Sequence, residues 1–309
     1  MKVLITGGAG FIGTEIASKC IELGADVVIV DDLSTGQYEE CHDKTRFYRV
    51  DCSSAEFEAV MREERPQLVL HHAAQANVRA SWLEPLEDVR RNVMGTIGVL
   101  RGCSAAGTQA LVFASSGGAV YGEGAELPLA EGHPCHPISP YGADKLVCEH
   151  YVRMWARENG SRATILRYGN VYGLRQDPQF GAGIIGILAR NMNRGEVTDI
   201  FGSGKQVRDY VHVSDVVAAN LKLLAGNLPA GTYNIGTGVG TSIATLCRML
   251  EETLPGRVAA VRHLPGNPYE VERNVLEISL AERLLGWRAT ISLAAGMRDF
   301  VGVGRFPVE

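Results

Sequence analysis

Short apolar runs alternate with stretches of helical periodicity through the first half of the chain. The apolar runs predict strands over Lys2–Thr6, Val27–Val30, Phe47–Asp51, Leu68–His72, Ala110–Ser115 and Ala163–Tyr168. Apolar residues recurring every three or four positions predict helices, over Phe11–Leu23, Pro85–Ala106 and Tyr141–Glu158. Strands that alternate with helices are typical of a parallel sheet with helices on both faces. The pattern therefore predicts an α/β fold with a doubly wound parallel sheet.

Two helix boundaries carry local signals. Gly24 follows the first helical pattern, and glycine commonly ends a helix. The run Ser53–Glu56 reads Ser-Ser-Ala-Glu, which fits a capping box and predicts a helix that starts there.

The second half of the chain is less regular. A loop containing glycine and proline runs from Gly173 to Gly183, and a helix is predicted over 184–194. We expect residues 208–216 and 231–238 to return to the first domain. The predicted domains are thus 1–170, with returning segments near 208–238, and a smaller, discontinuous C-terminal α/β lobe over 171–309 that binds the substrate.

Composition narrows the class of protein. The chain has 309 residues, 46% of them apolar, 36 glycines and a net charge of −5, which fits an α/β enzyme and gives no basic footprint for nucleic acid. No apolar run reaches about 18 residues, so no membrane span is expected. A strand begins at Lys2, so no signal peptide is expected. Seven cysteines without a C-x-x-C pair favour a reducing, cytoplasmic location.

A glycine cluster follows the first strand. Gly8, Gly10 and Gly13 satisfy G-x-G-x-x-G, while Gly7, Gly10 and Gly13 satisfy the related G-x-x-G-x-x-G. Either pattern allows a tight turn, close approach of the backbone to a pyrophosphate, and a helix N-terminus that faces the anion. The cluster predicts a Rossmann-type dinucleotide site.

An acidic residue, Asp31, ends the second predicted strand. An acid about 20 residues after the glycines is where such folds hold the ribose diol of the dinucleotide. A carboxylate there accepts hydroxyl hydrogen bonds and repels a 2′-phosphate. NAD is therefore expected rather than NADP.

Candidate catalytic residues follow the fifth strand. Ser115 and Ser116 lie at its end, where we expect both hydroxyls to point into the cofactor crevice, and Tyr141 and Lys145 come 25 and 29 residues after Ser116. Residues four apart on a helix share a face. A lysine ammonium beside a phenol lowers the phenol pKa from about 10, and the positive charge of bound NAD acts in the same direction. Tyr141 is therefore the expected general base.

Together these motifs resemble the extended short-chain dehydrogenases/reductases, the NAD-dependent epimerases and dehydratases, and among them the UDP-glucose 4-epimerases. The resemblance covers essentially the whole chain. It rests on TGGAGFIG (6–13), VDDLSTG (30–36), HHAAQANV (71–78), NVMGTIGVL (92–100), SSGGAVYG (115–122), SPYGADK (139–145), LRYGNVYGLRQDP (166–178) and RDYVHVSDV (208–216).

The resemblance assigns site residues by position. It implies NAD contacts from Gly7, Gly10, Phe11, Ile12, Gly13, Asp31, Asp32, Ser34, Gly36, Asp51, Cys52, His72, Ala73, Ala74, Gln75, Asn92, Ser115, Tyr141, Lys145 and Tyr168. It implies substrate contacts from Ser116, Tyr141, Asn170, Phe201, Arg208, Tyr210, Asn267 and Asn274. Ser116, Tyr141 and Lys145 are the implied catalytic residues. The implied reaction is epimerisation at C4 of UDP-glucose or UDP-galactose through a transient 4-keto sugar, as in galactose metabolism.

Other activities stay open. The resemblance also allows UDP-GlcNAc or UDP-glucuronate as the epimerised sugar, a 4-ketoreductase or dehydrogenase that exchanges its cofactor, and a non-catalytic NAD-binding protein. Nucleotide-sugar 4,6-dehydratases resemble this chain but carry an acidic pair where Gly117 and Gly118 stand. Glycine cannot protonate a leaving hydroxyl, so plain epimerisation is favoured.

The chain departs from the family at one point. The family places an arginine that grips the diphosphate where Asn267 stands, and Arg262, His263 or Arg273 could replace it. Counting on from Asn267 puts Asn274 at a position that limits the room beside the sugar; its small size predicts that UDP-GlcNAc is tolerated.

The resemblance also implies a homodimer. Its interface would be a four-helix bundle of Pro85–Ala106 and Tyr141–Glu158, with apolar surface from Val147, Tyr151, Met154 and Trp155. No metal is expected, because the adjacent His71 and His72 would point to opposite faces of their strand and no partner has ligand spacing.

Overall fold

A parallel sheet of seven strands forms the centre of the molecule. The computed structural model describes residues 1–36, 44–123, 126–173, 176, 183–224, 229–254, 256–266 and 270–302. The strand order is β10-β6-β5-β4-β1-β2-β3, and every neighbouring pair is parallel. The strands span Lys2–Thr6 (β1), Asp26–Asp31 (β2), Arg46–Arg49 (β3), Leu68–His71 (β4), Ala110–Ser116 (β5), Arg162–Tyr168 (β6) and Gly231–Ile235 (β10). The predicted α/β class and doubly wound parallel sheet are confirmed.

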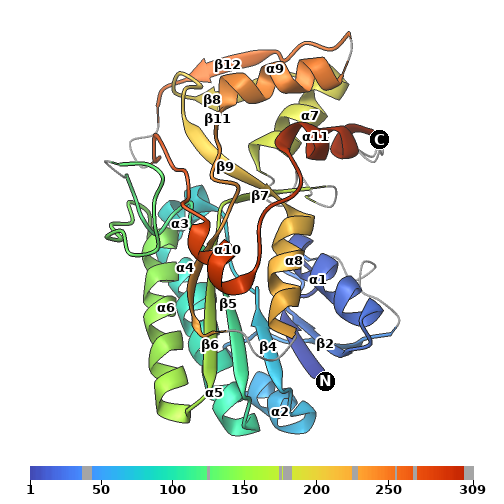
Figure 1. The fold of residues 1–309 in the computed structure, drawn as a ribbon, viewed down its shortest axis with the longest axis vertical. Coiled ribbons are helices and arrows are strands. Elements are labelled where there is room, and N and C mark those ends of the chain that lie inside the picture. Colours follow the sequence, from blue (N-terminus) through green and yellow to red (C-terminus); the bar gives the residue numbers. More distant parts are fainter. Residues whose placement is uncertain are drawn as a thin grey trace.

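Helices cover both faces of this sheet (Figure 1). The helices of this part of the molecule are α1 (Phe11–Glu22), α2 (Ala55–Glu64), α3 (Val78–Leu83), α4 (Pro85–Val89), α5 (Gly95–Ala106), α6 (Pro140–Asn159), α8 (Val213–Leu224) and α10 (Ser279–Leu285). Alternate strand residues point to opposite faces, so Val3 and Ile5 join one hydrophobic cluster with α1 and α8, while Leu4 joins another with α2, α5 and α6. Each face is thus closed by its own apolar core.

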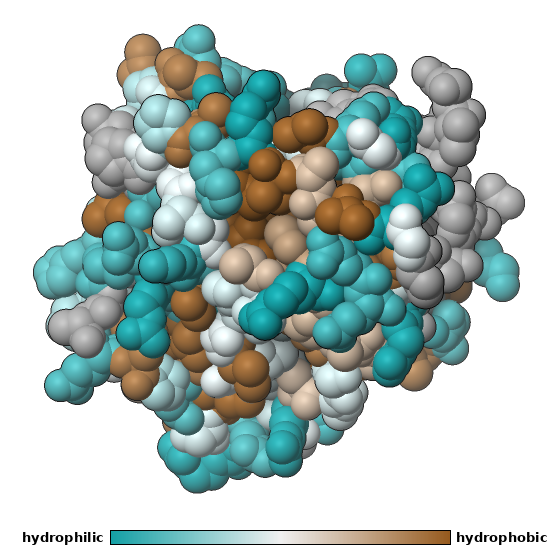
Figure 2. All heavy atoms as spheres, turned by 90° about the horizontal axis from the view of Figure 1, so that it is seen from above, coloured by the Kyte–Doolittle hydropathy of each residue, from teal (hydrophilic) through white to brown (hydrophobic). Residues whose placement is uncertain are grey.

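A second group of elements lies above the carboxyl ends of the sheet strands (Figure 1). Two small sheets have the orders β11-β9-β7 and β12-β8, and three helices pack with them around a separate apolar cluster. Their bounds are Asn170–Tyr172 (β7), Thr198–Phe201 (β8), Val207–His212 (β9), Gly240–Ser242 (β11), Val261–Leu264 (β12), Ile184–Arg194 (α7), Ile243–Thr253 (α9) and Leu293–Gly302 (α11). Seen from above, this region shows apolar side chains among polar ones (Figure 2).

The two segments expected to return to the first domain go to different places. Strand β10 joins the seven-stranded sheet beside β6. Strand β9 instead pairs with β7 and β11 in the three-stranded sheet, and only α8, which follows it, packs against α1.

The predicted helix Pro85–Ala106 is three elements. Helix α4 ends at Val89, a π-helical turn (η2, Arg90–Met94) follows, and α5 begins at Gly95. Such turns widen a helix locally and often lie at functional sites. This one carries Asn92, whose side chain enters the hydrogen-bond network described below. The separate helix α3 was not predicted.

The predicted capping box is wrong by one residue. Ser54 is the N-cap of α2, and its Oγ accepts a hydrogen bond of 3.3 Å from the backbone N–H of Phe57. Ser53 instead donates from its hydroxyl to Asp51 Oδ1. Glu56 therefore sits too early in the helix to close a box with the cap.

Candidate active site

The glycine turn between β1 and α1 has the geometry of a diphosphate cradle. Gly7 adopts a φ of +68°, and a Cβ there would lie 2.6 Å from the Ala73 backbone nitrogen. A Cβ on Gly13 would lie 2.1 Å from the Gly7 carbonyl oxygen. Gly10 is the N-cap of α1 and supplies no side-chain cap. The first N–H groups of α1, in Phe11 and Ile12, thus have no side-chain acceptor and suit an anionic ligand.

Asp31 lies at the carboxyl end of β2, directly beside this turn. Its Oδ2 accepts from the Ala9 N–H at 3.1 Å and its Oδ1 from the Leu33 N–H at 2.9 Å. Burial raises the pKa of this carboxyl group. The two backbone bonds fix the carboxylate at the edge of the cradle, where a ribose diol would meet it.

The neighbouring loops complete this half of the crevice. Asp32 Oδ1 accepts from both the N–H and the hydroxyl of Ser34, and a Cβ on Gly36 would lie 2.9 Å from Ala9 Cβ. After β3, Asp51 is held by Arg90, whose Nη1 lies 2.8 Å from Asp51 Oδ2.

Cys52, the residue after Asp51, lies against α5. A Cβ on Gly98 would come within 2.0 Å of the Cys52 carbonyl oxygen. Burial raises the pKa of the Cys52 thiol, so the thiol stays protonated.

The segment after β4 forms the opposite wall. His72 Nε2 lies 3.0 Å from the Tyr168 hydroxyl, which also accepts from Asn220 Nδ2 at 2.8 Å. The Ala73 N–H donates to Thr6 Oγ1 at 3.3 Å. Gln75 follows two residues after Ala73. Its backbone N–H donates to Asn92 Oδ1 and its carbonyl accepts from Asn92 Nδ2, so this segment lies against η2.

His71 takes no part in this wall. Both of its ring nitrogens lie within hydrogen-bonding distance of threonine hydroxyls, on Thr6 and Thr96. In the described ranges no group of three or more His, Cys, Asp or Glu side chains could hold a metal ion.

Ser116, Tyr141 and Lys145 meet at the carboxyl end of β5. Ser116 is the last residue of β5, and Tyr141 lies in the first turn of α6. Lys145 is almost fully buried, and its Nζ donates to the Ala114 carbonyl at 2.9 Å while lying 5.9 Å from the Tyr141 ring centroid. Tyr141 and Lys145 thus share one side of α6, as predicted from their spacing, and their catalytic role stays a prediction.

The pKa of Tyr141 differs from the expectation. Burial raises it to about 12, and the Ser116 hydroxyl only partly opposes this rise. The Lys145 ammonium, whose own pKa is lowered by burial, is directed at a backbone carbonyl. Burial of the phenol therefore opposes ionisation of Tyr141.

Ser115 does not share the direction of Ser116. Its hydroxyl donates to Glu149 Oε1 at 2.6 Å, and Glu149 receives two further bonds from Arg167. Adjacent strand residues point to opposite faces, so only one hydroxyl of the pair can face the crevice. The expectation that both do so is wrong.

Asn170 begins β7 close to Ser116. A Cβ on Gly118 would lie 3.4 Å from Asn170 Oδ1 and 3.8 Å from Ser116 Oγ. A Cβ on Gly117 would meet Leu276 at 2.8 Å. The space beside Ser116 thus remains free of any acidic side chain from these two positions.

The remaining predicted substrate residues lie above this edge. Arg208 reaches Glu270 Oε1 at 3.2 Å and the Val207 carbonyl at 3.0 Å. Tyr210, on the same strand, is buried. Asn274 is fully buried, and its Nδ2 donates to the Gly117 carbonyl at 2.9 Å. Asn267 lies outside the described residues.

The three possible replacements for the diphosphate arginine differ in their surroundings. Arg262 makes a two-pronged pair with Asp199, at 2.7 and 2.8 Å. His263 Nδ1 lies 2.7 Å from the Gly202 carbonyl. Arg273 donates from its backbone N–H to Glu123. Among the side-chain contacts that the structure describes for these three residues, only that of Arg262 is an ion pair with a carboxylate.

Sequence reasoning missed two features of this region. The Arg79 guanidinium carbon lies 5.4 Å from the ring centroid of Phe201, so α3 contacts the end of β8. Asp88 and Asp144, from α4 and α6, form a buried carboxyl pair. Neither feature has a local signal, because each joins residues more than 50 positions apart.

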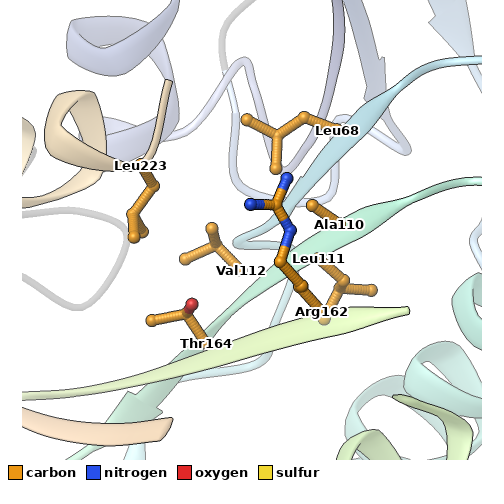
Figure 3. A pocket seen from close by; sticks show the side chains of 7 residues that line it. All are labelled: Leu68, Ala110, Leu111, Val112, Arg162, Thr164 and Leu223. Atoms are coloured by element: carbon orange, nitrogen blue, oxygen red, sulfur yellow. The ribbon is translucent and has the colours of Figure 1, made fainter. Parts of the chain in front are cut away.

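A small pocket elsewhere is not part of this site. It lies at the amino ends of three sheet strands and against α8, on the edge opposite to the crevice (Figure 3). Its lining consists of Leu68, Ala110, Leu111, Val112, Arg162, Thr164 and Leu223.

Comparison with known proteins identifies the family. Residues 3–236 match the NAD dependent epimerase/dehydratase family. The chain belongs to this family. A putative UDP-glucose 4-epimerase from Methanocaldococcus jannaschii is 42% identical over 299 residues, which cover 97% of each chain.

Two solved structures resemble the whole chain. A UDP-glucose 4-epimerase from Thermotoga maritima with UDP-glucose has a TM-score of 0.94 and 41% identity, covering 98% of both chains. A UDP-glucose 4-epimerase from Thermus thermophilus in complex with NAD has a TM-score of 0.92 and 39% identity, with the same coverage. Fold and sequence thus agree over the entire molecule.

Proposed function

We propose that this protein interconverts UDP-glucose and UDP-galactose at C4 with NAD as its cofactor. One observation carries the proposal: Lys145 Nζ lies 5.9 Å from the Tyr141 ring centroid, in a fold whose glycine turn has the geometry of a diphosphate cradle. Two solved structures that cover 98% of the chain are UDP-glucose 4-epimerases, and a third, which covers 97%, is a UDP-N-acetylglucosamine 4-epimerase.

Each catalytic side chain has a distinct task in this reaction. Tyr141 takes the proton of the sugar 4-hydroxyl, and Ser116 hydrogen-bonds the same oxygen and orients it. Lys145, fixed by the Ala114 carbonyl, holds the nicotinamide ribose. NAD, when bound, accepts the C4 hydride and supplies the positive charge that Tyr141 needs to ionise near neutral pH.

The cradle fits this cofactor. The uncapped start of α1 meets the pyrophosphate, and Asp31 accepts the ribose hydroxyls. A carboxylate at this place disfavours the 2′-phosphate of NADP.

Gly117 and Gly118 favour epimerisation over dehydration. A 4,6-dehydratase needs an acid to protonate the leaving 6-hydroxyl, and neither glycine can provide one. Leu276 packs so closely on Gly117 that any side chain at position 117 would displace Leu276. The ketone formed at C4 is therefore reduced again rather than dehydrated: reduction on the original face returns the substrate, and reduction on the other face after the sugar turns gives the epimer.

The substrate lobe is assigned to residues 171–309, apart from α8 and β10, which pack with the first domain. Arg208 is the candidate grip for the diphosphate, because its side chain is mostly buried at the end of β9 and the family arginine is replaced by Asn267. Asn274, held on the Gly117 carbonyl, borders the sugar and leaves room for an N-acetyl group. UDP-GlcNAc is therefore the second candidate substrate.

Exposed apolar side chains support a homodimer. They gather on α3, α4, η2 and α6 and comprise Trp82, Leu83, Leu86, Val89, Met94, Val147, Tyr151 and Met154. Trp155, expected among them, is buried and donates to Ser104 Oγ at 3.0 Å. A patch of this kind is typical of a protein–protein interface.

A cytoplasmic location is part of the proposal. The cysteines of the described residues are all free thiols, as is usual in a reducing compartment. No helix among the described residues is long and apolar enough to cross a membrane.

The test is an NMR assay of UDP-glucose, UDP-GlcNAc and UDP-glucuronate with purified protein and no added reductant. We expect UDP-galactose to form from UDP-glucose, and NAD to be found in the purified protein. The alternative of a non-catalytic NAD-binding protein predicts bound NAD without any conversion. The proposal fails if none of the three sugars is epimerised by protein that contains NAD.

A further inference from the structure

Two carboxyl groups face each other inside the molecule, one turn away from the catalytic residues. Asp88 lies on α4 and is 1% exposed, and Asp144 lies on α6, immediately before Lys145, and is 7% exposed. The Oδ2 atoms of both side chains are buried and lack an ordinary hydrogen-bond donor. Two ionised carboxylates in such a place would repel each other at low dielectric constant.

The contacts of Asp88 indicate where the charge resides. Its Oδ1 accepts from Gln75 Nε2 at 2.6 Å and from Asn92 Nδ2 at 3.1 Å. Both donors stabilise an ionised Asp88. Asp144 has no such donors, and its carboxyl lies within hydrogen-bonding reach of Asp88, so it serves as the donor of the pair.

We propose that Asp144 and Asp88 share one proton, and that this pair is a positioning element for the nicotinamide side of the active site. The shared proton holds Asp88 in place, and Asp88 in turn fixes the side chains of Gln75 and Asn92. Those two residues also bind each other, through the Gln75 N–H to Asn92 Oδ1 at 3.0 Å and through Asn92 Nδ2 to the Gln75 carbonyl at 3.1 Å. The expected effect of the pair on kcat rests on the proposed function, whereas the shared proton itself does not.

The pair also sets the charge beside the catalytic residues. Negative charge on Asp88 raises the pKa of Tyr141, and both aspartates favour the charged form of Lys145. With one proton present the pair carries one negative charge, which balances the Lys145 ammonium. Loss of the proton adds a second charge, which disfavours the Tyr141 phenolate.

Of the other ionisable groups around the pair, Glu87 and Glu149 are ion-paired with arginines, and Lys145 is the cation next to the pair in the sequence. Helix α4 also carries Glu87, which is bound by Arg90 and Arg91 of η2. The neighbours on the packed elements are Tyr141, Lys145, Cys148 and Glu149 of α6, Arg79 of α3, which lies over Phe201, and Arg167 of β6, which binds Glu149.

The proton is expected to leave near neutral pH. Burial first, and then the neighbouring Asp88, raise the pKa of Asp144 to about 7. The pair is therefore singly protonated below that pH and doubly ionised above it. Activity that depends on the shared proton must fall as the pH rises through this range.

The test compares the wild-type holoenzyme with Asp144→Asn and Asp144→Ala. The amide introduced by Asp144→Asn donates to Asp88 at every pH, whereas alanine donates at none. We expect the wild-type kcat to fall as the pH rises through the transition, because the second negative charge disfavours the Tyr141 phenolate. Asp144→Asn should keep the low-pH kcat without this fall, and Asp144→Ala should be low throughout. The proposal is overturned if Asp144→Asn retains the wild-type fall, or if the alanine variant behaves as the asparagine variant does.

A second measurement does not depend on the enzymatic activity. Infrared difference spectra between acidic and alkaline pH should contain the C=O band of a buried protonated carboxylic acid that disappears near neutral pH. Asp144→Asn and Asp88→Asn should each lack this band, while Glu282→Gln, a change on the distant α10, should retain it. An unchanged band in both aspartate variants would refute the shared proton even in an active enzyme. The band's presence in an inactive protein would instead refute only the proposed function.

Discussion

Replacing Gly13 with alanine should destroy the cofactor cradle. The new Cβ would lie 2.1 Å from the Gly7 carbonyl oxygen and 2.8 Å from Gly8 Cα. Ordinary contacts begin near 3.4 Å, and both neighbours are backbone atoms, so the turn itself must shift by about 1 Å. Overpacking of this kind costs about 1–3 kcal/mol, and the shift moves the first N–H groups of α1 away from the pyrophosphate.

The matched control is Gly132→Ala, where a Cβ meets nothing within 4 Å. Its effect on stability should stay within about 1 kcal/mol. NAD content after purification and the free energy of unfolding in urea are measured for both variants. We expect Gly13→Ala to bind NAD at least about tenfold more weakly, which corresponds to about 1.4 kcal/mol of binding free energy, and to retain less NAD after purification. Wild-type NAD content and stability in Gly13→Ala would refute the cradle geometry.

Four further changes test other parts of the site. Tyr141→Phe should lower kcat by about 10²–10⁴, the usual contribution of general acid–base catalysis, while NAD content stays normal, and Lys145→Ala should lower both; a wild-type kcat in Tyr141→Phe would rule out the assigned base. Calorimetry should show NAD binding far more tightly than NADP, and equal affinities would exclude the role given to Asp31. Light scattering should show a dimer at micromolar concentration and a monomer for Leu86→Glu, since Leu86 is 85% exposed; a monomeric wild type would contradict the interface. Asn274→Tyr should reduce turnover of UDP-GlcNAc far more than that of UDP-glucose, and an equal reduction would show that Asn274 does not limit the pocket.

The sequence predicted those parts of the site that depend on local spacing. The glycine turn, Asp31 and the Tyr141–Lys145 pair each lie within one strand–helix unit, where period and distance along the chain fix geometry. The alternation of strands and helices likewise predicted the sheet, although strand ends shifted by one or two residues, as β3 ends at Arg49 instead of Asp51.

What the sequence did not predict depends on packing between distant segments. The shared carboxyl pair joins Asp88 to Asp144, and the Arg79–Phe201 contact joins α3 to β8; neither has a spacing rule. Burial, which raises the pKa of Tyr141, likewise depends on several packed elements and has no signal in the spacing of Tyr141 and Lys145.

The most direct test of the account is the conversion of UDP-galactose by the purified protein in D₂O, without added nucleotide or reductant. The account predicts that UDP-glucose forms and that C4 keeps its original hydrogen, because that hydrogen moves as a hydride and never exchanges with solvent. Tyr141→Phe, with its NAD intact, should show almost no conversion. Absence of conversion by NAD-containing wild type, or deuterium at C4 of the product, would contradict the account.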